Sequence, residues 1–392
     1  MEAAMRKTFI HMSSKTGYPV MNRKTYGYAA RLTATALTTA LLALAGCTGT
    51  AEQAKKEEPT DLVWPLPPDP PRIKYVRSYR FREDVEERKK LSATDLLLGK
   101  KEEPGESLKR PYGVHADRDG RIFVTDTGWG KVVVFDSKNR KFEFWGESGR
   151  GTLQQPIGVT SDSTGRVYVT DAAQRRVVVF DRNGEFALAM GQTEELERPT
   201  GIAIDEDRRR VYVVDTRKHN IVVFDLDGRR ISTIGERGTA PGQFNFPTNL
   251  AVGRDGRLYV MDSMNFRVQI LDPDGRAIRA FGENGRSPGQ FARAKGIALD
   301  SEGHIYVVDA AFNNFQIFDP EGQLLLFVGS NGKSPGQFWL PAGAYIDNED
   351  RVYVADQYNL RVQVFQYLGE PAADAPAPQS ATAETPAEQP SQ

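Results

Sequence analysis

Short apolar runs alternate with polar turns through most of the chain, from residue 111 to residue 365. In one stretch the apolar runs cover 201–205, 211–214 and 221–224, and elsewhere turns such as DRDG at 117–120 separate them. β-Branched and aromatic residues dominate the runs, as is typical of strands, while Asp and Gly suit tight turns. A weaker fourth run, such as 277–281, completes the unit. The pattern predicts units of four short strands.

The unit recurs six times. Its central part reads RIFVTDTGWGKVVVFD, RVYVTDAAQRRVVVFD, RVYVVDTRKHNIVVFD, RLYVMDSMNFRVQILD, HIYVVDAAFNNFQIFD and RVYVADQYNLRVQVFQ. The internal aspartates are Asp126, Asp171, Asp215, Asp262, Asp309 and Asp356, spaced by 45, 44, 47, 47 and 47 residues. This period suits a propeller blade. Because one unit cannot bury both of its faces, we expect the units to stack around a ring.

The residue order within each unit resembles the NHL repeat. It runs Pro-x-Gly-apolar, Asp-x-x-Gly, Val-Tyr-Val-x-Asp and Arg-Val-x-Val-Phe, with Pro-Gly-Gln-Phe in the loops of the last three units. The resemblance covers roughly 111–365. It implies an all-β fold, a six-bladed β-propeller with four antiparallel strands per blade.

The sixth unit ends after its third strand, at 361–365, so its fourth strand is missing. The segment 73–80 has strand character and precedes the first unit. We predict that it fills this place, antiparallel to 361–365, and closes the ring, which offsets the entropy of closing a large loop. The segment 84–109, which includes DLLLG at 95–99, is expected to return the chain to the first blade with a short helix.

The N-terminal region has the order of a secretory signal: the basic residues Arg23, Lys24 and Arg31, then the apolar stretch 33–45. That stretch is shorter than the roughly 20 apolar residues of a spanning helix. Its end, LAGC at 44–47, resembles the bacterial lipobox, which implies lipidation of Cys47, the single cysteine. The alternative is an ordinary signal with an incidental cysteine. We expect Met21 to be the true start, since earlier residues overlengthen the signal.

These features predict a domain organisation. It consists of a lipoprotein signal peptide at 1–46, a lipidated tether with a Pro-rich segment at 47–72, the propeller at 73–369 and a disordered tail at 370–392. The tail is rich in Ala, Pro, Glu, Gln and Ser, so it cannot offset its own ordering entropy. Thr48 stands where inner-membrane lipoproteins carry a retention aspartate, so we expect the outer membrane.

Composition excludes little. Among 392 residues, 26% are charged and the formal net charge is -1, which gives no general attraction to nucleic acid. Once Cys47 is lipidated, no thiol remains for catalysis, metal or haem.

Two sets of loops should share one face of the ring: those from strand four to strand one, and those from strand two to strand three. Candidate binding residues there are Tyr112 and Lys295 near the first strands, with Trp129, Lys218, Phe266 and Phe312 in the second set. Large aromatic residues are frequent interface anchors; alternatively, they fold back on neighbouring loops. The basic residues of this face are Lys131, Arg175, Arg176, Arg217, Lys218, Arg267 and Arg361. The repeat aspartates recur in all six units, so we interpret them as structural acceptors for backbone N–H groups.

The first strands of the units also differ from one another at one position. Three units carry Ala203, Ala251 and Ala298 at one position, whereas the contiguous units one, two and six carry His115, Thr160 and Tyr345. Of these, His115 and Tyr345 are candidate binding residues of a central channel that holds a small ligand. The alternative is local packing near the seam.

Some NHL-like propellers are lyases with histidines around a metal in the channel. This chain departs from that pattern, because His115, His219 and His304 belong to different loops and strands of different units. A zinc site needs three or four converging ligands. We therefore assign no catalytic residue, no metal ligand and no cofactor.

The resulting hypothesis is an exported, lipid-anchored propeller that acts as a protein- or ligand-binding scaffold in the bacterial cell envelope. One alternative is a lyase or hydrolase that acts on a small exported metabolite in the channel; another is a binder of cell-wall polymer or peptide. The expected partner is an envelope protein or an anionic envelope component. We expect a monomeric propeller that meets the membrane only through its anchor and binds no nucleic acid.

Overall fold

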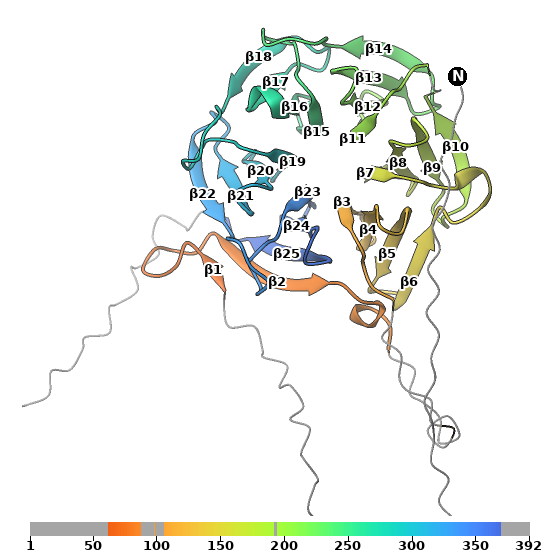
Figure 1. Cartoon of the computed structure of the whole chain (residues 1–392), viewed down its shortest axis with the longest axis horizontal. Coiled ribbons are helices and arrows are strands. Elements are labelled where there is room, and N and C mark those ends of the chain that lie inside the picture. Colours follow the sequence, from red (N-terminus) through yellow and green to blue (C-terminus); the bar gives the residue numbers. More distant parts are fainter. Residues whose placement is uncertain (1–61, 88–97, 99–105, 192–193, 370–392) are drawn as a thin grey trace, which may run out of the picture. The chain divides into compact units, whose positions relative to one another are not determined.

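The computed structural model describes residues 62–87, 98, 106–191 and 194–369. In this part of the chain, six antiparallel sheets surround a central axis (Figure 1). The all-β six-bladed propeller that the repeats predict is confirmed. Short 3-10 turns are the helical elements of this part: η1 (Arg82–Asp84), η2 (Gly149–Gly151) and η3 (Ser263–Asn265). None of the helices among the described residues has the length and apolarity to cross a bilayer.

The blades follow one another in chain order. The first three consist of β3 (Pro111–Ala116), β4 (Arg121–Asp126), β5 (Lys131–Asp136) and β6 (Lys141–Trp145); β7 (Pro156–Ser161), β8 (Val167–Asp171), β9 (Arg176–Phe180) and β10 (Phe186–Met190); and β11 (Pro199–Asp205), β12 (Arg210–Asp215), β13 (Asn220–Asp225) and β14 (Arg230–Ile234). Blades four and five consist of β15 (Pro247–Val252), β16 (Leu258–Asp262), β17 (Arg267–Leu271) and β18 (Ala277–Phe281); and β19 (Ala294–Leu299), β20 (Ile305–Asp309), β21 (Asn314–Phe318) and β22 (Leu324–Val328). Blade six consists of β23 (Pro341–Ile346), β24 (Arg351–Asp356), β25 (Arg361–Tyr367), β2 (Ile73–Tyr79) and β1 (Val63–Trp64).

The hairpin turns follow the Asp-x-x-Gly pattern. In the turn between β13 and β14, one oxygen of Asp225 accepts the backbone N–H groups of Asp227 at 2.9 Å and Arg229 at 2.8 Å. Gly228 lies at a φ of 86°, a left-handed conformation that suits glycine. The turn therefore depends on one carboxylate and one glycine.

Blade six is closed by the N-terminal strand, as predicted. β2 pairs antiparallel with β25, from Ile73 opposite Tyr367 to Tyr79 opposite Val362. The ring of Tyr75 packs edge-on against Phe365 at 5.7 Å between centroids. In Figure 1 this places the start of the described chain beside its end, so the seam joins two segments distant in sequence.

The first described strand lies within the predicted Pro-rich tether. β1 pairs with β2, with Trp64 opposite Ile73, and the indole of Trp64 lies 5.7 Å from the ring of Phe365. The remaining terminal predictions, including the signal, Cys47 and the tail, lie outside the described residues. The expected helix also falls mostly on segments outside them; of its predicted segment, Asp84 is the last residue of the short turn η1.

Six apolar clusters hold the ring together, one between each pair of neighbouring blades. An apolar residue from the loop that enters each blade closes the cluster at one end. These residues are Leu108, Leu153, Leu196, Phe244, Phe291 and Phe338, and none is more than 5% exposed. Phe244, Phe291 and Phe338 come from the Pro-Gly-Gln-Phe loops, so each such loop fixes two blades at once.

Candidate functional site: the loop face and the central channel

The hydrogen bonds of the repeat aspartates confirm that these residues are structural acceptors. Asp215, which is fully buried, accepts the backbone N–H groups of Glu197, Arg198, Arg217 and Lys218 at 2.6–3.2 Å. Two of these donors belong to the loop that enters blade three, and two belong to the loop between its second and third strands. The aspartate therefore joins both loops, which places them side by side on one face. We call the face built by these two sets of loops the loop face.

Blades four and six use a variation of this corner. Asp356 accepts the N–H of Trp339 at 2.8 Å and three side-chain donors, from Asn359, Arg361 and Gln363. Asp262 accepts the matching bonds in blade four.

The glutamines of this network hold the Pro-Gly-Gln-Phe loops. Gln363 accepts the N–H of Gly336 at 2.9 Å and donates to the carbonyl oxygen of Gln337 at 2.7 Å. Gln269 and Gln316 make the same two bonds to the loops before blades four and five. Blades one to three have valine at this repeat position and lack the motif in their entering loops. The glutamine and the loop motif therefore occur together, and they make this part of the face rigid.

Several candidate cations of the loop face serve the fold. Lys218 donates to the carbonyl oxygens of Glu194 and Glu195, and Arg361 donates to Asp356 and to two loop carbonyls. Arg267 and Arg176 also donate to loop carbonyls, Lys131 pairs with Glu147, and Arg217 pairs with Glu197 at 3.2 Å.

The candidate aromatic residues of the loop face are half-buried. The indole N–H of Trp129 donates to the carbonyl oxygen of Ser107 at 2.8 Å, and Phe144 packs against the ring. Phe266 packs against the apolar cluster between blades four and five. The backbone N–H of Phe312 points to Asp309 at 3.3 Å. Trp129 and Phe266 thus fold back on neighbouring elements.

Four other apolar residues of the loop face are more exposed, and sequence reasoning missed them. They are Phe246, Met264, Trp339 and Tyr358, exposed by 41–52%. Met264 and Tyr358 stand two residues after the repeat aspartate, where other units carry Gly, Ala or Arg. The sequence therefore did contain a signal for these two residues. It lies two residues after the repeat aspartate, whereas the candidate residues were chosen from the positions three and four residues after it.

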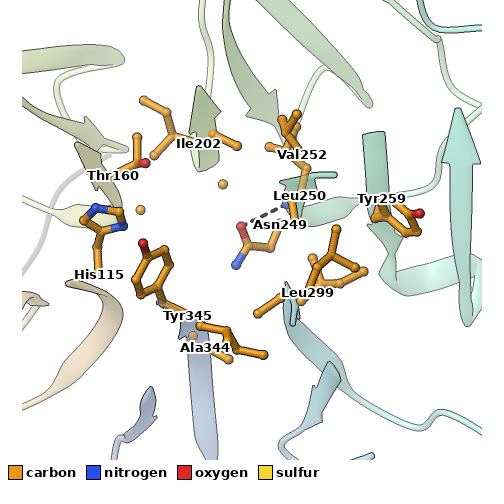
Figure 2. A pocket seen from close by; sticks show the side chains of 18 of the residues that line it. His115, Thr160, Ile202, Asn249, Leu250, Val252, Tyr259, Leu299, Ala344 and Tyr345 are labelled. Carbon is orange, nitrogen blue, oxygen red and sulfur yellow. Dashed lines mark hydrogen bonds between the residues drawn. The ribbon is translucent and has the colours of Figure 1, made fainter. Parts of the chain in front are cut away.

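The central channel is a cavity of about 570 Å³ lined by the first strands of all six blades (Figure 2). At one level of these strands, five blades carry glycine because adjacent strands approach closely. A Cβ on Gly158, for example, would lie 2.3 Å from the carbonyl oxygen of Thr200. Blade four carries Asn249 instead. Its Oδ1 accepts the N–H of Leu250 at 2.9 Å, and Figure 2 shows its amide reaching toward the middle of the channel.

The channel brings together the three polar residues of blades one, two and six. The rings of His115 and Tyr345 lie 4.1 Å apart, with Thr160 beside them (Figure 2). The Nε2 atom of His115 accepts the backbone N–H of Ser161 at 3.2 Å and lies 2.8 Å from its hydroxyl. Burial lowers the pKa of His115 to about 3 and raises that of Tyr345. Both side chains are therefore neutral at physiological pH.

Tyr112 and Lys295 meet at the mouth of the channel on the loop face. The Nζ atom of Lys295 lies 5.4 Å from the centre of the Tyr112 ring. Burial, reinforced by the charge of Arg293, lowers the pKa of Lys295 to about 8. Burial raises the pKa of Tyr112, and the guanidinium charges of Arg198 and Arg293 oppose that rise. Three cations from two blades thus act at this mouth.

Carboxylates gather at the opposite mouth, and they have partners within the protein. Asp300 bonds to His304, Asp347 pairs with Arg351 at 2.7 Å, and Asp255 pairs with Arg257 at 3.3 Å. Glu302 accepts the hydroxyl of Tyr367, and Arg254 lines the same mouth. The channel therefore differs in charge between its two ends.

The histidines lie apart. His219 accepts the N–H of Phe246 at the loop face, whereas His304 lies in the hairpin turn between β19 and β20. Among the described residues, no three His, Cys, Asp or Glu side chains are grouped to hold a metal ion.

Family models match two parts of this ring. Residues 151–235 and 248–314 match a family described as a 6-bladed beta-propeller, and residues 338–365 match the NHL repeat. The chain is a six-bladed β-propeller with an NHL repeat in its last blade. No curated protein sequence matches the propeller.

Solved structures share its fold. An auxiliary nutrient binding protein from Bacteroides thetaiotaomicron is 12% identical, with a TM-score of 0.53, over 66% of this chain and 69% of that one. A protein of unknown function from the same organism is 20% identical, with a TM-score of 0.51, over 66% and 70% of the two chains. Virginiamycin B lyase from Staphylococcus aureus is 13% identical, with a TM-score of 0.50, over 66% and 96%. At these identities the likeness concerns the propeller fold alone.

Proposed function

We propose that this propeller is a binding scaffold of the bacterial cell envelope, exported and anchored through lipidated Cys47, that holds a protein partner on its loop face. The observation that carries the proposal is the group of exposed apolar residues Phe246, Met264, Trp339 and Tyr358 on that face. Large aromatic side chains on rigid supports are frequent anchors of protein interfaces.

These anchors are held in place by the scaffold. The ring of Trp339 packs against that of Tyr358 at 5.6 Å between ring centres and is tilted by 38°, and the backbone N–H of Trp339 donates to Asp356. The N–H of Phe246 is bonded to His219 at 3.0 Å. Because its backbone is already fixed, the loop face would lose little conformational entropy when a partner docks.

Charge favours an acidic partner. A hollow of about 360 Å³ on the loop face is lined by Arg198, Thr216, Arg217 and Phe246. Arg198 is exposed and has no ion pair within the described part of the chain, and Lys333 lies 5.8 Å from the ring of Trp339. We expect an envelope protein that presents carboxylates beside an apolar side chain.

The catalytic alternative has less support from the channel. An imidazole with a pKa of about 3 is a weak general base at neutral pH, and the Nε2 atom of His115 already accepts the N–H of Ser161. A cell-wall polymer remains a different occupant of the same face, and the experiment below separates it from a protein.

The test is native purification from cross-linked, gently solubilised envelopes, with mass spectrometry of the captured protein. The loop-face variant carries Phe246→Ala, Trp339→Ala and Tyr358→Ala. The matched control carries Ile231→Ala, Ile278→Ala and Leu325→Ala, at residues exposed by 48–53% on the outer strands β14, β18 and β22. The proposal predicts one acidic partner, retained by the control and lost by the loop-face variant. Equal recovery with both variants, or capture of peptidoglycan fragments alone, would contradict it.

Anchoring has its own test. Cys47→Ser should move the protein from the membrane fraction to the soluble fraction and abolish incorporation of radiolabelled palmitate. A labelled, membrane-bound Cys47→Ser protein would exclude the anchor, whatever the loop face binds.

A further inference from the structure

The cations at the loop-face mouth of the channel form no ion pair with other described residues. Arg198 and Arg293 are exposed, and the Nζ atom of Lys295 lies 5.4 Å from the centre of the Tyr112 ring. By contrast, the carboxylates of the opposite mouth are paired or hydrogen-bonded. The unpaired charge at the loop-face mouth is therefore positive, whereas the opposite mouth carries mainly carboxylates.

Polar atoms without protein partners lie deeper in the channel. Within the described part of the chain, the Nδ2 of Asn249, the hydroxyl of Tyr345 and the hydroxyl of Thr160 make no hydrogen bond, whereas Oδ1 of Asn249 is used by Leu250. Figure 2 shows the Asn249 amide directed toward the open middle of the channel and the Tyr345 hydroxyl beside the His115 ring. Side-chain donors without a partner in such a space suit a ligand with hydrogen-bond acceptors.

Part of the wall is apolar. Blades three to five contribute the partly exposed side chains of Ile204, Val252 and Leu299 to the lining. The same blades carry alanine where the others carry His115, Thr160 and Tyr345, so the free volume lies on the apolar side. A volume of about 570 Å³ falls within the range of small-molecule sites.

We propose that the central channel binds a small organic anion with an apolar body, a carboxylate or a phosphate monoester, that enters from the loop face. Lys295, with Arg293 and Arg198, binds the anionic group at the mouth. Asn249 donates to an acceptor on the ligand body, and the body packs on the Ile and Leu side chains of blades three to five. This site lies at the same end of the ring as the protein partner proposed above and shares Arg198 with it, but Lys295 and Asn249 belong to the channel alone.

Two further observations fit this site. Burial and Arg293 lower the pKa of Lys295 to about 8, so a bound anion would relieve an unfavourable arrangement of charge. Asn249 stands where the five other blades have glycine, so the fold tolerates glycine at this level while this blade supplies an amide.

The test uses isothermal titration calorimetry with three probes: 3-phenylpropanoate, phenyl phosphate and the neutral 3-phenylpropanamide. The proposal predicts saturable, one-to-one binding of at least one anion and much weaker binding of the amide. Lys295→Met should weaken anion binding about tenfold, because it removes a charge-assisted hydrogen bond and keeps the apolar stem. Asn249→Gly should weaken anion binding about threefold, and all six blades then carry glycine at this level. Whichever of 3-phenylpropanoate and phenyl phosphate binds more tightly shows whether the natural ligand is a carboxylate or a phosphate monoester.

The matched control is Lys333→Met, which removes a cation of the loop face beside Trp339 and should leave probe binding unchanged. The Phe246, Trp339 and Tyr358 variant should also bind the probes normally, which separates this site from the partner site. The proposal is overturned if neither anion binds, if the amide binds equally well, or if Lys295→Met and Lys333→Met have equal effects. Melting temperatures of all variants would show that they remain folded.

Discussion

A single buried carboxylate fixes two loops at each corner of the ring. The sequence predicted this role from sixfold repetition alone, because a position that recurs in every blade serves what all blades share. The same logic explains what was missed. Asn249, Met264 and Tyr358 depart from their repeat positions, and such departures are visible only when every column of the repeat is compared. The exposure of a side chain also cannot be predicted from the repeat. Trp129 and Trp339 are both loop tryptophans in the sequence, but only the structure shows that Trp129 is half-buried and Trp339 is more exposed.

Asp356→Ala should destabilise the fold severely. It would leave the buried Arg361 and three other donors without their acceptor, a loss of about 3–5 kcal/mol in the free energy of unfolding. Asp227→Ala, at an exposed turn residue, should change that free energy by less than about 0.5 kcal/mol. Urea denaturation measures both; similar losses would contradict the corner mechanism.

His115 should make the fold sensitive to acid. Its pKa is about 3 in the folded chain and near 6.5 when unfolded, so between these values the unfolded chain binds a proton that the folded chain does not. Stability should therefore fall with decreasing pH, by up to about 1.4 kcal/mol per unit in this window. Relative to the parent, His115→Gln should gain about 2 kcal/mol between pH 7 and pH 5. Parallel stability curves for the two proteins would show that His115 titrates normally.

Among the elements, the closing strand was predictable and its extension was not. The last repeat lacks a fourth strand, and a strand-like segment precedes the first repeat. These two observations are enough to predict the pairing of β2 with β25. β1 contains only Val63 and Trp64, and prolines surround it, so composition indicated an extended tether. Its place in the sheet depends on contacts with Phe365 that no local pattern shows.

Tyr75→Ala should weaken the seam of the ring. The side chain is 8% exposed and packs on Phe365, so its loss should cost about 3 kcal/mol of unfolding free energy. Val76→Ala is the control, because this neighbour on the same strand is 40% exposed. If both variants melt at the parental temperature, the closing strand contributes little to stability.

Across the whole molecule, the two ends of the channel differ in charge, and this difference should appear in the pH dependence of anion binding. Tyr112, Arg293 and the Asp309 carboxylate surround Lys295. Lys295 loses its proton as pH rises through about 8, so the affinity for the anion that binds should fall about tenfold between pH 7 and pH 9.5. Calorimetry at a series of pH values should show this fall in the parent and not in Lys295→Met. A flat parental profile would place the anion elsewhere.

The central claim is that the loop face holds a protein partner, and in vivo photo-cross-linking tests it most directly. A photoreactive phenylalanine replaces exposed Ala311 on the loop face or exposed Glu321 in the hairpin between β21 and β22 on the opposite face. The account predicts one discrete cross-linked protein from position 311, absent from position 321 and lost with Trp339→Ala and Tyr358→Ala. Cross-links from position 321 alone, or none from either position, would contradict it.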